Sequence, residues 1–433
     1  MSCRQVDQVR LLFIAIPVMA LVACGDIAAP VGPQQALPTG EVWTTYRGDL
    51  RNDGHPATAR LNASESARLG LAWRVKMGAA VNGSPAVSNG LVVAASQGGQ
   101  IAAYTSSSGT QVWAASGLGP ISDSPMIVDD RVVAASLSGH AYAFDLRRGT
   151  RLWDWTAPGI KPAIWSSPVV YGQLVLIGIG SQYGDAPLDI GRIVALNVTS
   201  GREAWEMCVL AGCSPGGGIW STPAVDSEGR GFVGTGNPVD GILAFDALTG
   251  RRLWITSFYA DAGLDLDVGA SPVLLEVDGR EAVGEGSAAG TFKLLDAATG
   301  VDIWSRNLVS GSAVHGLIAS PAFDGSSIYV PSASPPTGVF ALAPTDGAIR
   351  WQHGTDQPIY SSPAAGSGVL VVGTGAVFGD VHTGSIVVLS SVDGRVLWTY
   401  DAHSAVYSSP AIAGTLVLVG DSNGDVFAFR PSS

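Results

Sequence analysis

The sequence predicts an all-β fold, an eight-bladed β-propeller of four-stranded blades that is closed by pairing of the N- and C-terminal strands. Three observations indicate this fold: a recurring Gly-x-x-x-Trp unit, a Ser-Pro or Thr-Pro after each tryptophan, and an incomplete unit at each end of the repeat. Repeats of ~45 residues that contain several short strands are typical of propeller blades.

The tryptophan motif is clearest in residues 241–254, which read Ala-x-Asp-x-x-Thr-Gly-x-x-x-Trp from Ala244 to Trp254. The same glycine-to-tryptophan spacing occurs at Gly109/Trp113, Gly149/Trp153, Gly201/Trp205, Gly250/Trp254, Gly300/Trp304, Gly347/Trp351 and Gly394/Trp398. Trp73 is an eighth tryptophan without the glycine. Side chains alternate before each glycine, and glycine allows the positive φ of a tight turn, so the motif predicts a β-hairpin.

The second mark opens a new apolar run after each tryptophan. It consists of a Ser-Pro or Thr-Pro at Pro85, Pro125, Pro168, Pro223, Pro272, Pro321, Pro363 and Pro410, which gives eight units. The last unit ends at residues 426–430 without a tryptophan strand, whereas residues 71–75 form a tryptophan strand without preceding strands. Joining the two in one sheet would remove the exposed edges of an open array.

The N-terminus is typical of an exported protein. Residues 1–23 hold two arginines and then a short apolar run, and Leu-Val-Ala-Cys-Gly follows at residues 21–25. This predicts a lipoprotein signal peptide with Cys24 as the lipidated first residue. The alternative is an ordinary secretory signal that contains a cysteine. Residues 24–42 are rich in proline and small residues and predict a flexible tether, and the propeller occupies residues 43–433.

Composition limits the partners of the protein. A formal charge of −12, only three lysines and the absence of a basic run argue against nucleic-acid binding. In an exported protein, Cys208 and Cys213 predict a local disulfide. The sequence contains neither a Cys-x-x-Cys-His haem motif nor histidines at metal-ligand spacing.

The tryptophan repeat, the Ser-Pro strand and the number of units resemble the pyrroloquinoline quinone (PQQ) propeller superfamily over roughly residues 43 to 430. That superfamily includes quinoprotein alcohol dehydrogenases, polyvinyl-alcohol-dehydrogenase-like proteins and the non-catalytic propeller lipoprotein of the barrel-assembly machine. Residues 216–226, 234–238 and 264–272 resemble the dehydrogenase branch more closely. The resemblance implies that Trp220 is the floor under the PQQ ring, that Asn237 is a Ca²⁺ ligand and that Asp267 is the base that accepts the alcohol proton.

Each of these residues also has a structural interpretation. Trp220 shares its repeat position with Trp165, Tyr360 and Tyr407, and Asp267 belongs to an acidic segment that solvent could cover. A glutamate expected as a second Ca²⁺ ligand falls in residues 181–185, where Asp185 or the nearby Asp189 would have to replace it. A basic residue expected beside the quinone falls at Ala288. The Asn-Trp or Gly-Gly-x-x-Trp element that the resemblance implies for blade six is replaced by His315-Gly316-Leu317-Ile318.

Two functions follow. Because these features are missing, we expect a non-catalytic, lipid-anchored scaffold of the cell envelope, a monomer that binds proteins or carbohydrate on its propeller faces. The alternative is a PQQ- and Ca²⁺-dependent alcohol or polyol dehydrogenase, with Asp267 as the base, Trp220 and Asn237 holding the cofactor, and Asn237, Asp267 and Asp185 as candidate metal ligands.

Overall fold

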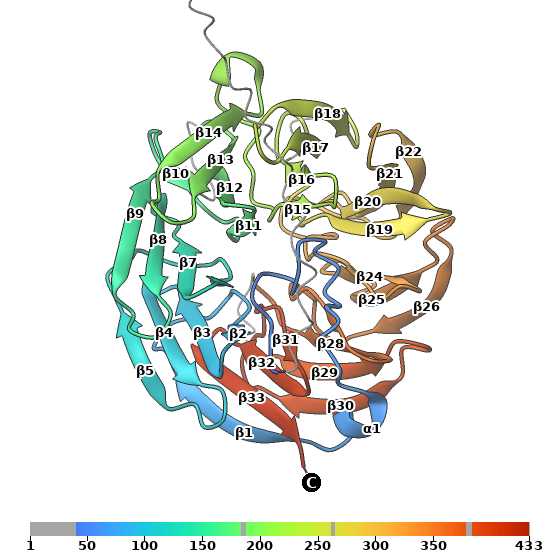
Figure 1. Cartoon of the computed structure of the whole chain (residues 1–433). Coiled ribbons are helices and arrows are strands. Elements are labelled where there is room, and N and C mark those ends of the chain that lie inside the picture. The colour runs from blue at the N-terminus through green and yellow to red at the C-terminus, as the bar shows by residue number, and fades with distance from the viewer. Residues whose placement is uncertain (1–39, 183–187, 261–264, 378–382, 433) are drawn as a thin grey trace, which may run out of the picture. The chain divides into compact units, whose positions relative to one another are not determined.

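A computed structural model describes residues 40–182, 188–260, 265–377 and 383–432. The unit from Ala36 to Ser433 is a ring of antiparallel sheets (Figure 1). Within the described residues there are eight sheets; seven are blades of successive strands, and the eighth combines the last strands of the chain with the first. The predicted fold class is therefore confirmed.

The strands follow the sequence blade by blade. Blades 1 and 2 contain β2 (Ala86–Ser88), β3 (Leu91–Ser96), β4 (Gln100–Thr105) and β5 (Gln111–Ala115), then β6 (Met126–Val128), β7 (Arg131–Ala135), β8 (His140–Asp145) and β9 (Arg151–Thr156). Blades 3 and 4 contain β10 (Pro162–Ala163), β11 (Val169–Tyr171), β12 (Leu174–Ser181), β13 (Arg192–Asn197) and β14 (Glu203–Cys208), then β15 (Ala224–Val225), β16 (Arg230–Thr235), β17 (Gly241–Asp246) and β18 (Arg252–Ser257).

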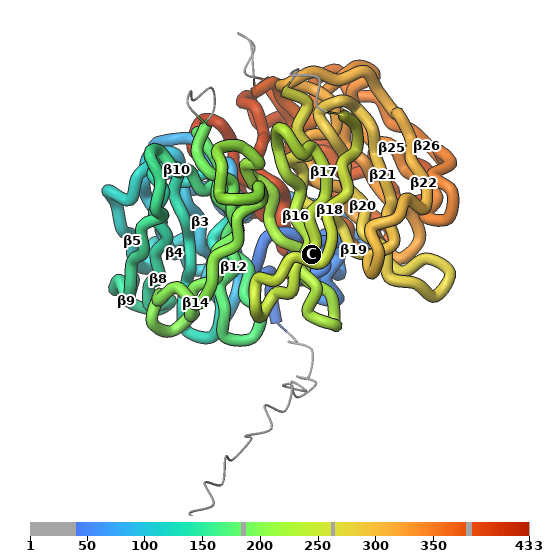
Figure 2. The backbone as a smooth tube through the Cα atoms, turned by 90° about the horizontal axis from the view of Figure 1, so that it is seen from above, coloured from blue at the N-terminus to red at the C-terminus, as the bar shows by residue number. Residues whose placement is uncertain are grey.

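Blades 5 and 6 contain β19 (Val273–Val277), β20 (Arg280–Gly286), β21 (Thr291–Asp296) and β22 (Asp302–Asn307), then β23 (Ala322–Phe323), β24 (Ile328–Ser332), β25 (Gly338–Leu342) and β26 (Ile349–Gly354). Blades 7 and 8 contain β27 (Ala364–Ala365), β28 (Val369–Gly373), β29 (Ser385–Ser390) and β30 (Val396–Asp401), then β31 (Ala411–Ala413), β32 (Leu416–Gly420), β33 (Asp425–Pro431) and β1 (Leu69–Lys76). Figure 2 shows the blades from the side.

Two features depart from the regular repeat. Blade 3 has the extra strand β10, which pairs with the end of β12. Helical structure in the described ranges is limited to α1 (Ala63–Ser66) and the 3₁₀ turn η1 (Ala211–Cys213). Neither is long enough to cross a membrane, and the described part of the chain contains no other helix that could.

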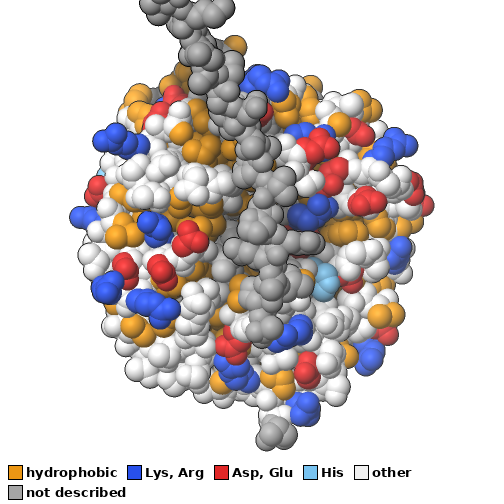
Figure 3. Space-filling view, in the orientation of Figure 1, with side chains coloured by type: hydrophobic (Ala, Val, Ile, Leu, Met, Phe, Trp, Pro, Cys, Tyr) orange, Lys and Arg blue, Asp and Glu red, His pale blue; other side chains and the backbone are white. Residues whose placement is uncertain are grey.

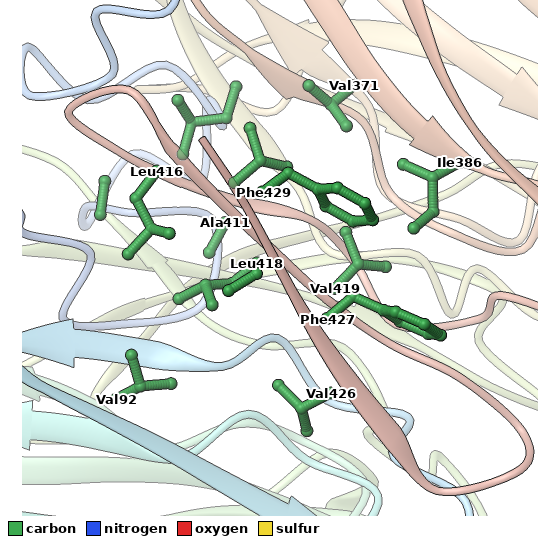
Figure 4. Close-up of a cluster of buried hydrophobic side chains, with 14 of the residues drawn as sticks. Val92, Val371, Ile386, Ala411, Leu416, Leu418, Val419, Val426, Phe427 and Phe429 are labelled. Carbon is green, nitrogen blue, oxygen red and sulfur yellow. The ribbon is translucent and has the colours of Figure 1, made fainter. Parts of the chain in front are cut away.

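Blade 8 closes the ring as the chain ends predicted. Strand β1 pairs antiparallel with β33, from Leu69 opposite Pro431 to Lys76 opposite Asp425. Phe427 and Phe429 of β33 are buried within the apolar cluster shown in Figure 4. The sheet therefore pairs strands from the two ends of the repeat, and β33 is paired on both of its edges, with β1 and with β32.

The tryptophans form an outer girdle, because seven of the eight pack on the repeat glycine of the next blade. A β-carbon added at Gly109, whose φ is +68°, would lie 2.8 Å from the Trp73 ring. The Trp73 indole N–H also donates to the Ser106 carbonyl oxygen at 2.9 Å. At the other end of the ring, Trp398 donates to the carbonyl oxygen of Leu69 in β1 at 3.0 Å. The motif thus joins neighbouring blades.

The hydroxyls of the Ser-Pro and Thr-Pro motifs form an inner ring around the propeller axis. In seven of the eight motifs, the backbone N–H of the Ser or Thr donates to the hydroxyl of its counterpart in the next blade. The distances are 2.8 Å from Ser84 to Ser124, 2.9 Å from Ser124 to Ser167, 3.0 Å from Ser167 to Thr222, 2.9 Å from Thr222 to Ser271, 2.8 Å from Ser271 to Ser320, 2.9 Å from Ser320 to Ser362 and 3.1 Å from Ser362 to Ser409. The Ser84 hydroxyl donates to the Ser409 carbonyl oxygen at 2.7 Å and completes the circle.

A segment before the first blade crosses one end of the axis (blue in Figure 1). It bonds to the innermost strands of most blades, through Trp43 to Val87, Thr44 to Ile127, Leu50 to Val225, Arg51 to Leu274, Asp53 to Phe323, Gly54 to Ala365 and Thr58 to Gly414. The Tyr46 hydroxyl reaches the ring hydroxyls of Ser320 and Ser362 at 2.8 and 3.0 Å. We call residues 43–58 the plug, because they cover this end of the channel.

Charges are mixed on the face seen in Figure 3. Acidic and basic side chains alternate around its rim, and basic side chains do not gather into one patch there. The absence of nucleic-acid binding stays a prediction from composition.

Candidate active site

The residues two positions before the inner-ring hydroxyls form a second circle, which we call the mouth ring. Its members are Asn82, Ser122, Trp165, Trp220, Gly269, Ile318, Tyr360 and Tyr407. A chamber of about 260 Å³ lies between this ring and Tyr46 of the plug. The mouth ring is aromatic in blades 3, 4, 7 and 8 only, so the repeat does not maintain one chemistry here.

A larger pocket of about 560 Å³ opens beyond the mouth ring on the side away from the plug. Its wall brings together the sequence-predicted Trp220, Asn237 and Asp267 with the aromatic residues Trp165 and Tyr360. Pockets of this size that combine apolar walls with a few polar groups are typical of cofactor and substrate sites. The three residues proposed from the sequence therefore share one cavity.

Trp220 presents its indole among glycines. A β-carbon added at Gly269 would lie 3.0 Å from Trp220 Cε3, and one added at Gly180 would lie 3.0 Å from Trp220 Nε1. The indole nitrogen is buried and has no hydrogen-bond partner among the described residues. The surrounding glycines leave part of the indole without side-chain cover, which suits the stacking of a planar ligand.

Asn237 is fixed by its backbone and by one end of its amide. Its backbone N–H donates to Asp267 Oδ1 at 2.9 Å, and its Nδ2 donates to Asp265 Oδ1 at 3.1 Å. Its carbonyl oxygen accepts the N–H of Gly217 at 2.6 Å. The amide oxygen Oδ1 is buried and has no partner in the described part of the chain. An oriented amide oxygen without a donor is the kind of ligand that a hard cation prefers.

Asp267 lines the pocket and is only 6% exposed. Gly236 makes room for it, because a β-carbon there would lie 2.6 Å from Asp267 Oδ1. Burial raises the pKa of Asp267 to about 7; the Asn237 N–H lowers it, and the charges of Asp265 and Asp240 raise it further. A carboxyl group that titrates near neutrality can accept a proton and release it again at working pH.

The segment that leads into Trp220 is held by a disulfide. Cys208 and Cys213 are bonded, with their Cα atoms 5.3 Å apart. Four residues later, Gly217 donates to Asn237, while Gly216 donates to the Asp189 carbonyl oxygen at 2.9 Å. The disulfide thus closes the loop that immediately precedes Gly217, which contacts Asn237, and Trp220, whose indole lines the pocket.

Of the two remaining metal candidates, Asp189 is not among the residues that line the pocket. Asp185 lies outside the described residues. Asp189 is buried, and its carboxylate accepts a hydrogen bond from the backbone N–H of Lys161 at 2.9 Å. This bond ties the segment before β13 to the segment before β10. No group of three His, Cys, Asp or Glu side chains within the described ranges is arranged to hold a metal ion.

The pocket fits a planar cofactor in shape and in part in charge. The indole of Trp220 offers a stacking surface, and Asn237 Oδ1 with the Asp267 carboxylate offers oxygen ligands to a cation. Among the described residues, those that line the pocket include Ala288, Asp265 and Asp267 but neither lysine nor arginine. An anionic quinone such as PQQ would therefore need a bound cation to offset the two carboxylates.

Sequence reasoning missed two features of this site. The Asp265–Asn237 contact joins two loops of adjacent blades, and the sequence placed Asp265 only in an acidic run. The sequence placed Trp165 and Tyr360 at the repeat position of Trp220 without marking them as site residues, and the structure places them in the wall of the same pocket. The shared position before the Ser-Pro motif was the signal that could have found them.

Comparisons with known proteins agree with this architecture. Residues 61–281 and 288–433 match the PQQ-type family model described as outer membrane protein assembly factor BamB. A polyvinylalcohol dehydrogenase from Sphingopyxis sp. (strain 113P3) is 30% identical over 185 residues, which cover 32% of this chain and only 28% of that relative. The chain therefore matches less than a third of the length of that dehydrogenase.

Solved structures share the fold at low sequence identity. The quinohemoprotein alcohol dehydrogenase from Comamonas testosteroni has a TM-score of 0.77 at 17% identity, covering 90% of this chain and 80% of that one. BamB from Moraxella catarrhalis has a TM-score of 0.65 at 17% identity, covering 84% and 99%. The chain belongs to the PQQ-like β-propeller family of the outer membrane protein assembly factor BamB, a fold that it shares with quinoprotein alcohol dehydrogenases.

Proposed function

We propose that the pocket binds a planar quinone of the PQQ class together with a cation, and that the protein oxidises an alcohol. The observation that carries this proposal is the meeting of Trp220, Asn237 and Asp267 in one cavity of about 560 Å³. This geometry favours the dehydrogenase over the scaffold that the missing ligands led us to expect. The partial similarity to a polyvinylalcohol dehydrogenase supports it.

The roles of the residues follow from their surroundings. Trp220 would stack on the ring, and Asn237 Oδ1 with Asp267 would hold the cation. A quinone of this class supplies the two-electron acceptor. Asp267 accepts the hydroxyl proton of the alcohol, and the hydrogen bond from the Asn237 N–H keeps its carboxylate oriented. The apolar walls formed by Trp165 and Ile318 exclude water from the carboxylate.

The test is a titration of the purified full chain with PQQ, with Ca²⁺ or with a chelator, followed by tryptophan fluorescence, bound-quinone absorbance and the thermal midpoint. We expect binding that depends on Ca²⁺ and is weakened tenfold or more in Asn237→Ala. Asn82→Ala is the matched control, because Asn82 also has a buried, unpartnered amide oxygen but lies outside the larger pocket. Absence of bound quinone in wild type at millimolar concentrations would contradict the proposal.

A second function is a non-catalytic scaffold of the cell envelope. It is supported by the family match and by a pocket lining without lysine or arginine. In that case partner crosslinking in envelope fractions should be weakened by a surface change such as Ile160→Glu, where the side chain is 79% exposed, and unchanged by Asp267→Asn.

For either function we propose an exported protein anchored by lipid at Cys24. The Cys208–Cys213 disulfide suits an oxidising compartment. Cys24→Ser should abolish fatty-acid labelling and release the protein from membranes. Unchanged labelling and fractionation would exclude the anchor.

A further inference from the structure

Glu285 occupies a core position that is apolar in every other blade. The position is defined by strand register. In each blade the girdle tryptophan is opposite a residue of the neighbouring strand, that residue is opposite one in the next strand inward, and the position follows this last residue by one. Its other occupants are Ala94, Ala134, Ile177, Val233, Val330, Val372 and Val419. All seven are buried. The repeat therefore does not require a carboxyl group here, and blade 5 alone carries one.

Both carboxyl oxygens of Glu285 are buried, and neither has a hydrogen-bond partner among the described residues when it acts as an acceptor. Lys293 is opposite Glu285 in the register of β20 and β21, but its Nζ pairs with Asp302 at 2.8 Å. An unpaired carboxylate at 0% exposure would cost several kcal/mol. Burial is the cause that raises the pKa of Glu285 well above its usual range. The side chain is therefore a neutral acid with one O–H to donate.

An acceptor for this O–H lies in the loop that carries Asp267. A β-carbon added at Gly234 would lie 2.0 Å from Glu285 Oε1 and 2.3 Å from the Val268 carbonyl oxygen. The two oxygens therefore face the same space over the Gly234 α-carbon, and glycine is needed there to admit them. Two oxygens brought together without a proton between them would repel each other.

We propose that the Glu285 carboxylic acid donates a hydrogen bond to the Val268 carbonyl oxygen and thereby positions Asp267. The other backbone bonds of this turn are the Val268 N–H to the Thr235 oxygen at 3.3 Å and the Ala288 N–H to the Asp267 oxygen at 2.9 Å. Glu285 adds a tie from the core side. Its role in turnover rests on the proposed function, whereas the hydrogen bond itself does not.

Three variants test the inference on the full chain. Glu285→Gln keeps a donor, Glu285→Val introduces the residue of four sister blades, and Lys293→Met removes the alternative partner. Because the folded-state pKa is raised above that of the unfolded chain, the contribution of Glu285 is fully present below the usual pKa and is lost as pH rises. We expect the thermal midpoint of wild type to fall more steeply between pH 5 and 8 than that of either Glu285 variant. Lys293→Met should keep the wild-type slope.

Hydrogen exchange of the peptide spanning residues 265–272 provides a readout that does not depend on activity. Exchange should be about tenfold faster in Glu285→Val and close to wild type in Glu285→Gln, although the valine variant should melt at the same temperature or higher. If the protein turns over alcohol, only the valine variant should lose kcat, by about tenfold.

Equal pH slopes in wild type and Glu285→Gln, or unchanged exchange in Glu285→Val, would overturn the inference. A flattened slope in Lys293→Met would show instead that Glu285 pairs with the lysine. Failure of wild type to bind quinone would overturn the proposed function only, because the slope and the exchange would still report the hydrogen bond.

Discussion

The girdle and the mouth ring both use one position per blade, but only the girdle repeats its chemistry. Trp351 packs on Gly394 of the next blade and donates to the Ser391 carbonyl oxygen at 3.0 Å. Near the other end of the chain, Trp73 makes the same two contacts with Gly109 and Ser106. The mouth ring instead changes from asparagine and serine in blades 1 and 2 to tryptophan in blades 3 and 4.

The difference follows from what each position contacts. A girdle residue contacts the same backbone surface of the next blade every time, so one residue type fits everywhere. A mouth residue faces the open channel, so the fold does not dictate its identity. Positions where the repeat diverges are therefore where a ligand site can be built, and the pocket around Trp220 lies at such positions.

Removing residues 424–433 breaks the regular half of this comparison and should have the largest effect. The deletion exposes the edges of β1 and β32 and removes buried Phe427 and Phe429, each worth roughly 3–5 kcal/mol by large-to-small precedent. We expect loss of a cooperative melt. A truncated protein that melts within a degree or two of the full chain would show that the shared blade is dispensable.

Asp267→Asn addresses the divergent half. The amide keeps the size of the side chain and an oxygen for the cation but cannot accept a proton. Turnover should therefore fall on the order of 10²-fold, while quinone affinity falls less than in Asn237→Ala. Steady-state kinetics with short alcohols and a dye acceptor, alongside a binding titration, separate the two. Full activity in this variant would remove Asp267 from the chemistry.

The smallest effect that we predict is on the pH dependence of folding stability, and it comes from Asp49 in the plug. Burial first and the charge of Asp53 second raise the pKa of Asp49 to about 7, although the backbone hydrogen bond from Arg51 lowers it. The unfolded carboxyl ionises near pH 4, so stability falls as pH rises from about 4 to 7, by at most about 1.4 kcal/mol per pH unit. Asp49→Asn should flatten the thermal midpoint across this window. A midpoint that rises with pH there in wild type only would refute the assignment.

The fold was predictable from the sequence because the girdle and inner-ring residues repeat without interruption. Trp254 packs on Gly300 of the next blade, and Gly250 packs against Trp205 of the preceding blade, so both partners of each contact recur visibly in the sequence. The hydroxyl ring was not predicted, although its Ser-Pro and Thr-Pro motifs were counted, since the bonds between neighbouring motifs join residues 40 to 55 positions apart.

The candidate site was only partly predictable. Trp220, Asn237 and Asp267 were named through resemblance, and the cavity that holds them depends on how loops of adjacent blades meet. Glu285 was missed because a glutamate in an alternating strand reads as an outward-facing residue. Only the register of β20 against β21 places it in the core.

The central claim is that repeated positions build the fold and divergent positions build the binding site, and a paired measurement on Trp220→Ala and Gly394→Ala tests it most directly. Gly394 has φ +71° and a β-carbon there would lie 2.6 Å from Trp351, so its variant should melt several degrees lower and bind quinone as wild type does. Trp220→Ala should weaken quinone binding about tenfold or more and shift the melt by no more than about 3 °C. Quinone affinity that is unchanged in Trp220→Ala, or lost equally in both variants, would contradict the account.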